Sequence, residues 1–307
     1  MFVSALVVSF FALAVPQSPP AAPTPPAQTL VYPPSDPAKD IAAALTAAKA
    51  DGKHVLLDFG ADWCPDCRVL GKLFEDPAVA PFVAANFHVV HIDVGRRDKN
   101  GDVVAQYGAT SGAWIPAVVV LDHSGKSVGV TDETVRLTRR DTPQTLLPML
   151  QAWAPKKLVS ALATFTAWGV DVSVSLEEDG LGALWLASTF TPGDARVHLY
   201  AAQLPDDGVD GLGRPTRVML GDDAPLVAVG APIATRPVLA DRIDALGLTV
   251  PIYPDGPVTL LQRVTRRATS SAGAARVTYM GCSPMGCLPP VEGRRIVIAA
   301  PQVRAPR

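Results

Sequence analysis

The chain contains four cysteines, and they form two closely spaced pairs. Two residues separate Cys64 from Cys67, and four residues separate Cys282 from Cys287. A disulfide across so few residues closes a very small loop, so it constrains the unfolded chain little. Stabilisation of the fold is therefore a poor explanation for either pair. Thiol–disulfide chemistry or metal binding remains.

The first pair lies in the sequence DWCPDC at 62–67, between a predicted strand at 54–59 and a predicted helix at 64–74. Free N–H groups at a helix N-terminus stabilise a thiolate, so we expect Cys64 to be exposed and acidic. Cys67 lies one turn further on, where it can attack a mixed disulfide formed at Cys64. This spacing suits a nucleophilic sulfur followed by a resolving one.

Two further features bear on this pair. Asp66 places a negative charge between the two cysteines, and we expect that charge to favour a reducing couple. A structural zinc site built from both cysteine pairs is the alternative. A CxxC sequence at the start of a helix that follows a strand is more typical of redox use. We predict neither a metal nor a cofactor.

The sequence up to about residue 154 alternates between helical and extended patterns. Strands that alternate with helices and then end in a hairpin indicate an α/β sheet covered on both faces. The predicted helices are 40–50, 64–74, 77–86, 102–107 and 142–153, and the predicted strands are 54–59, 87–94, 117–121 and 127–130.

The pattern changes after a plausible domain boundary at 154–157. Short strand candidates then recur, separated by clusters of Gly, Pro and Asp, which is typical of an all-β sandwich. These candidates are 170–175, 183–190, 196–201, 217–220, 258–264, 275–280 and 296–299. A chain of 307 residues is long enough for two such domains.

The N-terminus has the composition of an export signal followed by a tether. Residues 2–15 carry no charge and are too few to span a bilayer, which needs about 20 residues. We expect a signal peptide over 1–15; a buried N-terminal strand or helix is the alternative. Residues 16–37 include nine prolines, and we expect an extended linker there. The chain would then be periplasmic or otherwise exported, and soluble after cleavage.

The overall charge gives no sign of a nucleic-acid partner. The formal net charge is −2, and no basic stripe or acidic run is present. Hydrophobic residues make up 48% of the chain and charged residues 18%, which is typical of a globular protein.

Two motifs in the first half resemble the active site of thioredoxin-fold proteins. They are LDFGADWCPDC at 57–67 and WIPA at 114–117, and the resemblance covers about 38–154. It implies that Cys64 is the nucleophile and Cys67 the resolving thiol. It also implies that Asp58 is a buried carboxylate that exchanges a proton with Cys67.

The same resemblance assigns Pro116 as a cis-proline against the sulfurs, with Ile115 and Trp63 contacting the substrate. Thioredoxins often place a lysine near the buried carboxylate. The corresponding strand reads VVHID at 89–93 and has no lysine, which leaves His91 as a candidate partner. As alternatives, Asp58 caps a turn, and Trp63 and Trp114 are core or rim aromatics.

The second pair lies in YMGCSPMGCLPP at 279–290, between two strand candidates. Its residues alone leave open a redox pair or a local structural clip. The segment is similar to the cysteine loop of the N-terminal immunoglobulin-like domain of the DsbD family of bacterial thiol:disulfide interchange reductases. The resemblance implies that Cys287 forms the mixed disulfide and that Cys282 is its redox mate.

This resemblance covers about 158–300 of a predicted β-sandwich domain at 155–301. Within it, HLY at 198–200, GRP at 213–215 and VPIY at 250–253 are similar short signatures. The cysteine loop is one residue shorter than in that family. The aromatic cap that shields its sulfurs is missing, and Leu246 lies in the comparable region. The fold class implied overall is an α/β thioredoxin fold plus an all-β immunoglobulin-like sandwich.

Together these features predict an exported protein-disulfide reductase. Electrons would pass between the two cysteine pairs by contact of the two domains, and then to oxidised exported proteins. Their source would be a separate membrane electron donor. A disulfide oxidase or isomerase is one alternative. The other is a client-binding chaperone module whose β domain has no redox role.

Overall fold

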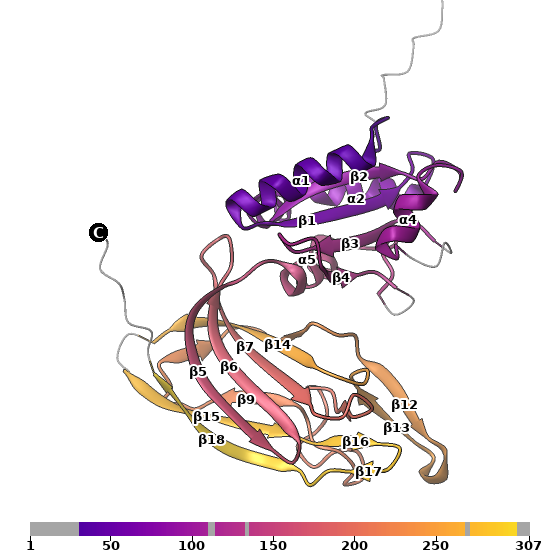
Figure 1. The fold of residues 1–307 in the computed structure, drawn as a ribbon. Coiled ribbons are helices and arrows are strands. Elements are labelled where there is room, and N and C mark those ends of the chain that lie inside the picture. Colours follow the sequence, from indigo (N-terminus) through magenta and orange to yellow (C-terminus); the bar gives the residue numbers. More distant parts are fainter. Residues whose placement is uncertain (1–30, 110–113, 133–134, 268–270, 300–307) are drawn as a thin grey trace, which may run out of the picture. The chain divides into compact units, whose positions relative to one another are not determined.

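The structure, a computed structural model, describes residues 31–109, 114–132, 135–267 and 271–299 (Figure 1). The predicted signal peptide at 1–15, and the predicted linker up to residue 30, lie outside the described residues. Within the described residues, no helix is both long and apolar enough to span a membrane.

The first half is an α/β structure whose elements follow the predicted order. Its central sheet has the strand order β2-β1-β3-β4, in which β1 and β2 are parallel and the other neighbours are antiparallel. The elements are α1 (Pro37–Asp51), β1 (His54–Gly60), α2 (Pro65–Glu75), α3 (Ala80–Asn86), β2 (Phe87–Asp93), α4 (Gly101–Tyr107), β3 (Ala117–Leu121), β4 (Ser127–Val130) and α5 (Pro143–Trp153).

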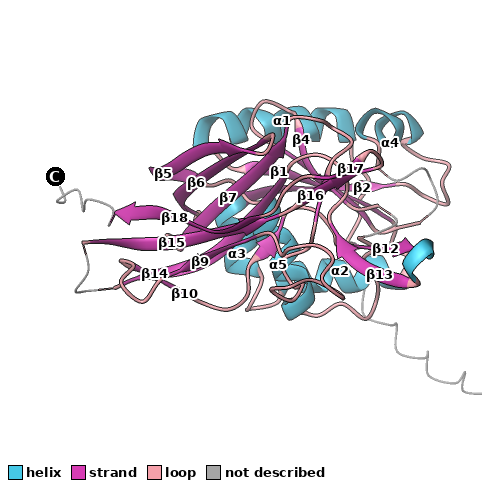
Figure 2. Cartoon of the chain, turned by 90° about the horizontal axis from the view of Figure 1, so that it is seen from below, coloured by secondary structure: helices cyan, strands magenta, loops and turns pink. Residues whose placement is uncertain are grey.

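Side chains of β1 alternate between two buried cores, one on each face of this sheet. Val55, Leu57 and Phe59 pack with residues of α1 and α4, whereas Leu56 packs with residues of α2, α3 and α5. Figure 2 shows these helices in cyan and the strands in magenta. Since side chains two apart share a face of a strand, Asp58 lies on the same face as Leu56.

The residues just before α1 differ from the prediction of a linker through residue 37. Tyr32 is only 1% exposed, and the N–H of Val31 donates to Asp62 Oδ1 at 2.8 Å. A Cβ added to Gly60 would lie 2.2 Å from the Tyr32 hydroxyl oxygen, so the glycine leaves room for the ring. An aromatic side chain that finds such a space is buried even within a proline-rich stretch.

The second half is rich in strands. These are β5 (Lys157–Ala167), β6 (Val170–Glu178), β7 (Leu184–Pro192), β8 (His198–Leu199), β9 (Arg217–Leu220), β10 (Leu226–Ala228), β11 (Ile233–Ala234), β12 (Leu239–Ile243), β13 (Leu248–Ile252), β14 (Val258–Arg266), β15 (Ala272–Tyr279), β16 (Gly281–Ser283), β17 (Gly286–Cys287) and β18 (Val291–Ala299), with a short 3-10 helix η1 (Asp244–Leu246).

Two of its sheets share one hydrophobic core. The larger sheet follows the order β10-β14-β7-β6-β5, with β11 also paired to β14, and the smaller follows β18-β15-β9. Val172 and Leu260 of the larger sheet lie in the same buried cluster as Val277 and Ile298 of the smaller. This is the arrangement of a β sandwich, as the short strand candidates predicted.

Several strands of this half were not predicted. The sequence of β5, KLVSALATFTA, has no sustained apolar run, and its side chains are exposed or half-buried because it lies at the edge of its sheet. The predicted strand at 196–201 is reduced to β8. The predicted boundary at 154–157 falls between the end of α5 and the start of β5; the division into independent domains stays a prediction.

Candidate active site

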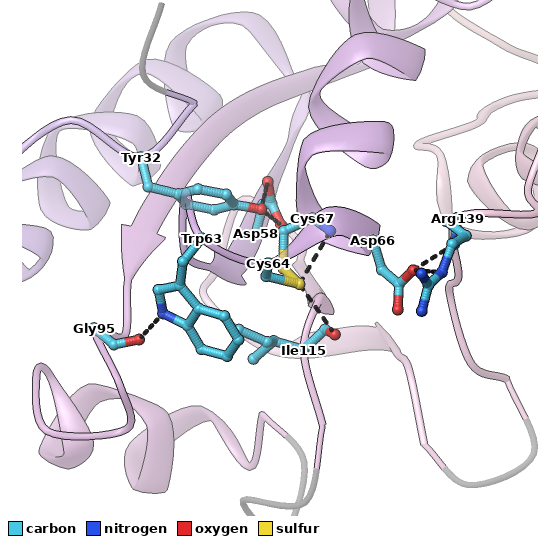
Figure 3. Close-up of a disulfide and its surroundings, with 9 residues drawn as sticks. All are labelled: Tyr32, Asp58, Trp63, Cys64, Asp66, Cys67, Gly95, Ile115 and Arg139. Carbon is cyan, nitrogen blue, oxygen red and sulfur yellow. Dashed lines mark hydrogen bonds and ion pairs between the residues drawn. A yellow bond between two sulfur atoms is a disulfide. The ribbon is translucent and has the colours of Figure 1, made fainter. Parts of the chain in front are cut away.

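The first two cysteines form a disulfide at the start of α2. Cys64 is the residue that caps the helix, and Pro65 occupies its first turn. The backbone N–H of Cys67 donates to Cys64 Sγ at 3.2 Å (Figure 3). The helix therefore directs a free N–H group at the first sulfur, which is the environment that favours a thiolate when the disulfide is reduced.

The first sulfur is less accessible than expected, whereas the second is buried as expected. We predicted an exposed Cys64, yet Cys64 is 4% exposed and Cys67 is fully buried. The two cysteines form a small buried cluster with Tyr32, against which Val31 and Ile115 also pack. The prediction was wrong because the segment before α1 covers the pair.

The cis peptide bond predicted by the resemblance is present between Ile115 and Pro116. Pro116 is buried, and the carbonyl oxygen of Ile115 lies 3.7 Å from Cys64 Sγ. The start of α2 and the segment before β3 therefore meet at the disulfide. Contact of Ile115 with an extended substrate stays a prediction.

Asp58 lies in β1 and is completely buried. The Tyr32 hydroxyl donates to both of its carboxylate oxygens at 3.0 Å. His91 Nδ1 lies 2.9 Å from Asp58 Oδ2. This last contact follows from the sheet, because β1 and β2 are parallel neighbours and their register pairs Asp58 with His91. His91 is therefore the basic side chain that contacts the buried carboxylate, as the sequence suggested.

The surroundings of Asp58 act on its protonation in opposite directions. Burial raises the pKa of the Asp58 carboxyl, while the contacts with His91 and Tyr32 lower it, and the net direction is upward. Burial and the charge of Asp58 both raise the pKa of Tyr32, so the phenol remains a donor. Sequence reasoning found His91 but missed Tyr32, whose only signal is an aromatic residue within a proline-rich stretch.

Asp66 does not act as the isolated negative charge that we expected. The backbone N–H of Arg139 donates to Asp66 Oδ1 at 2.9 Å, and Arg139 Nε lies 3.0 Å from the same oxygen (Figure 3). Arg139 belongs to the loop before α5, too far along the chain to be foreseen. Because the arginine offsets the carboxylate charge, Asp66 gives a weaker reason for a reducing couple than predicted.

Of the two tryptophans near the pair, Trp63 is the exposed one. Its side chain is 51% exposed, and its indole N–H donates to the Gly95 carbonyl oxygen at 2.8 Å. Trp114 is half-buried and lies under the Arg136 guanidinium, 4.2 Å from the ring centroid. Trp63 therefore exposes part of its indole ring beside Cys64, and its contact with substrate stays a prediction.

The second pair is also a disulfide, and it spans a two-stranded hairpin. Cys282 in β16 lies directly opposite Cys287 in β17. Cys282 is 4% exposed, whereas Cys287 is exposed, and Met285 at the tip of the hairpin is 85% exposed. The two sulfurs therefore differ in access, and an incoming thiolate reaches Cys287 more easily.

Two of the three short signatures noted in the sequence, at 198–200 and 250–253, gather around this hairpin. His198 in β8 pairs with Cys282, and the Tyr200 hydroxyl lies 3.2 Å from Cys282 Sγ. Val250 and Ile252 of β13 share a buried cluster with Tyr200 and Cys282. Leu246, which lies in the region where the related family has its aromatic cap, is 59% exposed in η1.

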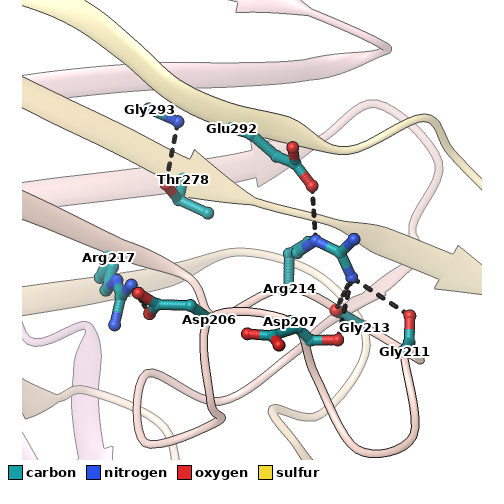
Figure 4. A network of polar contacts seen from close by, with 9 residues as sticks. All are labelled: Asp206, Asp207, Gly211, Gly213, Arg214, Arg217, Thr278, Glu292 and Gly293. Carbon is teal, nitrogen blue, oxygen red and sulfur yellow. Dashed lines mark hydrogen bonds and ion pairs between the residues drawn. The ribbon is translucent and has the colours of Figure 1, made fainter.

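The third signature, at 213–215, has a structural explanation. Arg214 Nε contacts Glu292 Oε1 in β18, and its guanidinium donates to the carbonyl oxygens of Asp207, Gly211 and Gly213 (Figure 4). A second ion pair joins Arg217 to Asp206. These contacts fix the loop before β9 and assign no chemistry to it.

The relatives found by comparison with known proteins match the first half of the chain. Residues 36–123 match the sequence model of the thioredoxin-like family. Thioredoxin H4 of Arabidopsis thaliana is 39% identical over 49 residues, which is 16% of this chain. The chain spans only 41% of the length of that curated relative.

Solved structures cover the same part. The disulphide isomerase of Xylella fastidiosa Temecula1 is 35% identical, with 38% of this chain and 90% of that chain covered and a TM-score of 0.37. The DsbH oxidoreductase is 26% identical, with 38% and 83% covered and a TM-score of 0.25. Residues 36–123 therefore belong to a thioredoxin-like domain, and its relatives imply thiol–disulfide oxidoreductase activity.

Proposed function

We propose that this chain is an exported protein-disulfide reductase in which its two cysteine pairs act in series. The observation that carries the proposal is the Cys64–Cys67 disulfide at the start of α2, between a cis-proline and a buried carboxylate. A second disulfide with one exposed sulfur, at Cys287, provides an acceptor in the same chain.

Reduction of the second pair by the first requires two exchanges. The Cys64 thiolate attacks Cys287 Sγ, which forms a mixed disulfide and releases Cys282 as a thiolate. The Tyr200 hydroxyl, 3.2 Å from Cys282 Sγ, is placed to donate to that leaving sulfur. Cys67 then loses its proton and attacks Cys64 Sγ, which releases Cys287. Two electrons pass to the second pair, and Cys64–Cys67 becomes a disulfide again.

The reduced second pair would then reduce client proteins by the same chemistry. Exposed Cys287 attacks the client disulfide, and Cys282 resolves the mixed disulfide. The resemblance of the cysteine loop to the DsbD family favours this role. The presence of both cysteine pairs on one chain favours exchange between them, because a short connection raises the effective concentration of one pair at the other into the millimolar range.

Export and the electron donor are proposed from the sequence. The uncharged run at 2–15 has the length and composition of a signal, and the proline-rich segment after it suits a tether. An exported reductase must be reduced again after each cycle. We therefore propose a separate membrane protein that delivers reducing equivalents to Cys64–Cys67, with oxidised exported proteins as the final acceptors.

A disulfide oxidase or isomerase is the second candidate, and one contact favours it. Arg139 offsets the charge of Asp66, which removes part of the reason for a reducing couple. Reduction potentials of both pairs separate the two functions. A reductase relay requires the Cys64–Cys67 potential to lie at or below that of Cys282–Cys287, whereas a potential close to that of a strong oxidant would favour the oxidase.

Disulfide trapping tests the relay most sharply. The full chain carrying Cys67→Ser and Cys282→Ser retains only Cys64 and Cys287. We expect an intramolecular Cys64–Cys287 disulfide, seen as a linked peptide in a protein that runs as a monomer without reductant. The matched control carries Cys64→Ser and Cys282→Ser and should link far less. Absence of the link in the first variant would remove the relay, and equal linking in both would show that the contact is not specific.

A further inference from the structure

We infer that Tyr32 and His91 are positioning residues that hold Asp58 as a carboxylate, ready to accept the proton of Cys67 when this thiol resolves a mixed disulfide. The inference rests on the proposed thiol–disulfide exchange at the first pair, and it deepens that function. It assigns a role to a tyrosine that precedes the first helix and to a histidine on the neighbouring strand.

Two side chains from different segments contact the buried carboxylate. The Tyr32 hydroxyl contacts both oxygens at 3.0 Å, and His91 Nδ1 contacts Oδ2 at 2.9 Å. Tyr32 also packs against Cys64 and Cys67 in one buried cluster (Figure 3). The same side chain therefore contacts both the cysteine pair and the Asp58 carboxylate. Tyr32, His91 and Asp58 therefore form one connected unit beside the reacting sulfurs.

Both donors are themselves held in place. Asp62 Oδ1 accepts the N–H groups of Val31 at 2.8 Å and Tyr32 at 3.4 Å, which fixes the segment that carries the phenol. The His91 ring packs edge-on against the Tyr32 ring, with 5.7 Å between the ring centroids. The Phe74 ring of α2 lies 6.3 Å from the His91 ring, also between centroids. Such packing keeps the two hydrogen bonds aligned.

The donors are needed because burial alone would disable Asp58. A carboxyl removed from water favours its neutral form, which cannot accept a proton. Hydrogen bonds donated to a carboxylate favour the charged form instead. The titratable groups that face Asp58 are Tyr32 from the preceding segment, His91 from β2 and the cysteine pair from α2. Its register partner in β3 is Val118, which does not titrate.

The proton transfer belongs to the second exchange. Cys67 Sγ–H gives its proton to the Asp58 carboxylate, and the resulting thiolate attacks Cys64 Sγ in the mixed disulfide. The Cys64–Cys67 bond forms, the bond to the acceptor sulfur breaks, and that sulfur leaves as a thiolate. Asp58 then releases its proton to water. His91 is the member of the unit that reaches solvent, because its side chain is 31% exposed.

A single-turnover experiment separates the two exchanges. The full chain carries Cys282→Ser and Cys287→Ser, so that only the first pair reacts, and it is reduced before mixing with a bis(nitrobenzoate) disulfide. Attack by Cys64 releases one coloured thiolate, and resolution by Cys67 releases the second. Absorbance therefore records two phases, and each is measured as a function of pH.

We expect Tyr32→Phe and His91→Phe each to slow the second phase about tenfold at neutral pH, and to shift its pH profile upward. The first phase should change less than about twofold. His91→Asn, which keeps a donor close to the Nδ1 position, should restore most of the rate. Tyr253→Phe is the matched control, because it also removes a buried phenol that makes a hydrogen bond, in the β-rich half.

Three outcomes would overturn the inference while the proposed function stands. The first is an unchanged second phase in both variants. The second is a slowdown of equal size at every pH, which indicates a structural role. The third is an equal slowdown in Tyr253→Phe. If the first phase of the parent chain is no faster than that of a free thiol, the proposed function itself fails, and the inference fails with it.

Discussion

The two disulfides of this chain are placed in contrasting environments. Cys64–Cys67 lies at a helix N-terminus with both sulfurs buried, and is surrounded by ionisable groups such as Asp58, His91 and the Asp66–Arg139 pair. Cys282–Cys287 spans a small hairpin with one sulfur exposed. We therefore expect charge and proton transfer to tune the reactivity of the first pair, and unequal solvent access to tune that of the second.

The largest expected effect comes from removing the sulfur of Cys64. Cys64→Ser should lower thiol–disulfide exchange with a protein disulfide on the order of 10³-fold or more, because a hydroxyl is hardly ionised at neutral pH. Turnover of insulin with a small dithiol as reductant measures this. Cys282→Ser with Cys287→Ser is the comparison, and it should leave the first pair active. Equal losses in both variants would contradict a division of roles.

The next largest effect concerns the buried carboxylate. Asp58→Asn removes the proton acceptor of Cys67 and should slow resolution of a mixed disulfide about 10²-fold at neutral pH. The same single-turnover phases report it, with attack by Cys64 as the internal control. If Asp58→Asn resolved the mixed disulfide at the parent rate, Cys67 would not need Asp58 as its proton acceptor.

Asp58→Asn should also make the folded chain more stable at neutral pH. Since burial raises the folded-state pKa of Asp58 above its unfolded value, the folded state holds this proton more tightly. Its contribution to stability is therefore present at acid pH and is lost as the pH rises through the folded pKa. We expect Asp58→Asn to raise Tm by a few degrees at pH 7, and by less at acid pH. A larger gain in Tm at acid pH than at pH 7 would contradict the upward shift of the Asp58 pKa.

A smaller effect tests the asymmetry of the second pair. In the fully reduced chain, brief alkylation should label exposed Cys287 about tenfold faster than Cys282, which is buried at 4% exposure. Peptide mapping measures the ratio. Labelling of both cysteines at one rate, or of Cys282 first, would remove the reason for choosing Cys287 as the attacked sulfur.

The smallest effect concerns Arg139. Arg139→Ala leaves the Asp66 charge unpaired beside Cys64, so alkylation of Cys64 at neutral pH should slow about two- to fivefold. The double variant Asp66→Asn with Arg139→Ala removes both charges and should recover the parent rate. If the single and double variants behave alike, the ion pair has no influence on the thiolate.

Much of the first half could be predicted from its sequence, because local signals agreed with the fold. Pro65 and the CxxC sequence mark the start of α2, and the buried runs of β1 and β3 identify the core strands. Even the contact between Asp58 and His91 follows from strand order and register. Arg139 and Tyr32 could not be foreseen, because both lie outside the helices and strands, where no register relates them to their distant partners.

The second half was less predictable for the opposite reason. Edge strand β5 and the small pairs β12–β13 and β16–β17 have weak alternation, because tertiary pairing decides whether such segments become strands. The short signatures at 198–200 and 250–253 were visible as sequence. Only folding shows that they converge on Cys282.

The most direct test of the account is the rate of alkylation of Cys64 in the reduced Cys67→Ser chain at mildly acid pH. The start of α2 should keep this thiol ionised where free cysteine is protonated, so we predict a rate at least about tenfold above that of free cysteine. A rate equal to that of free cysteine would contradict the account, because Cys64 would then have no reason to be the attacking sulfur.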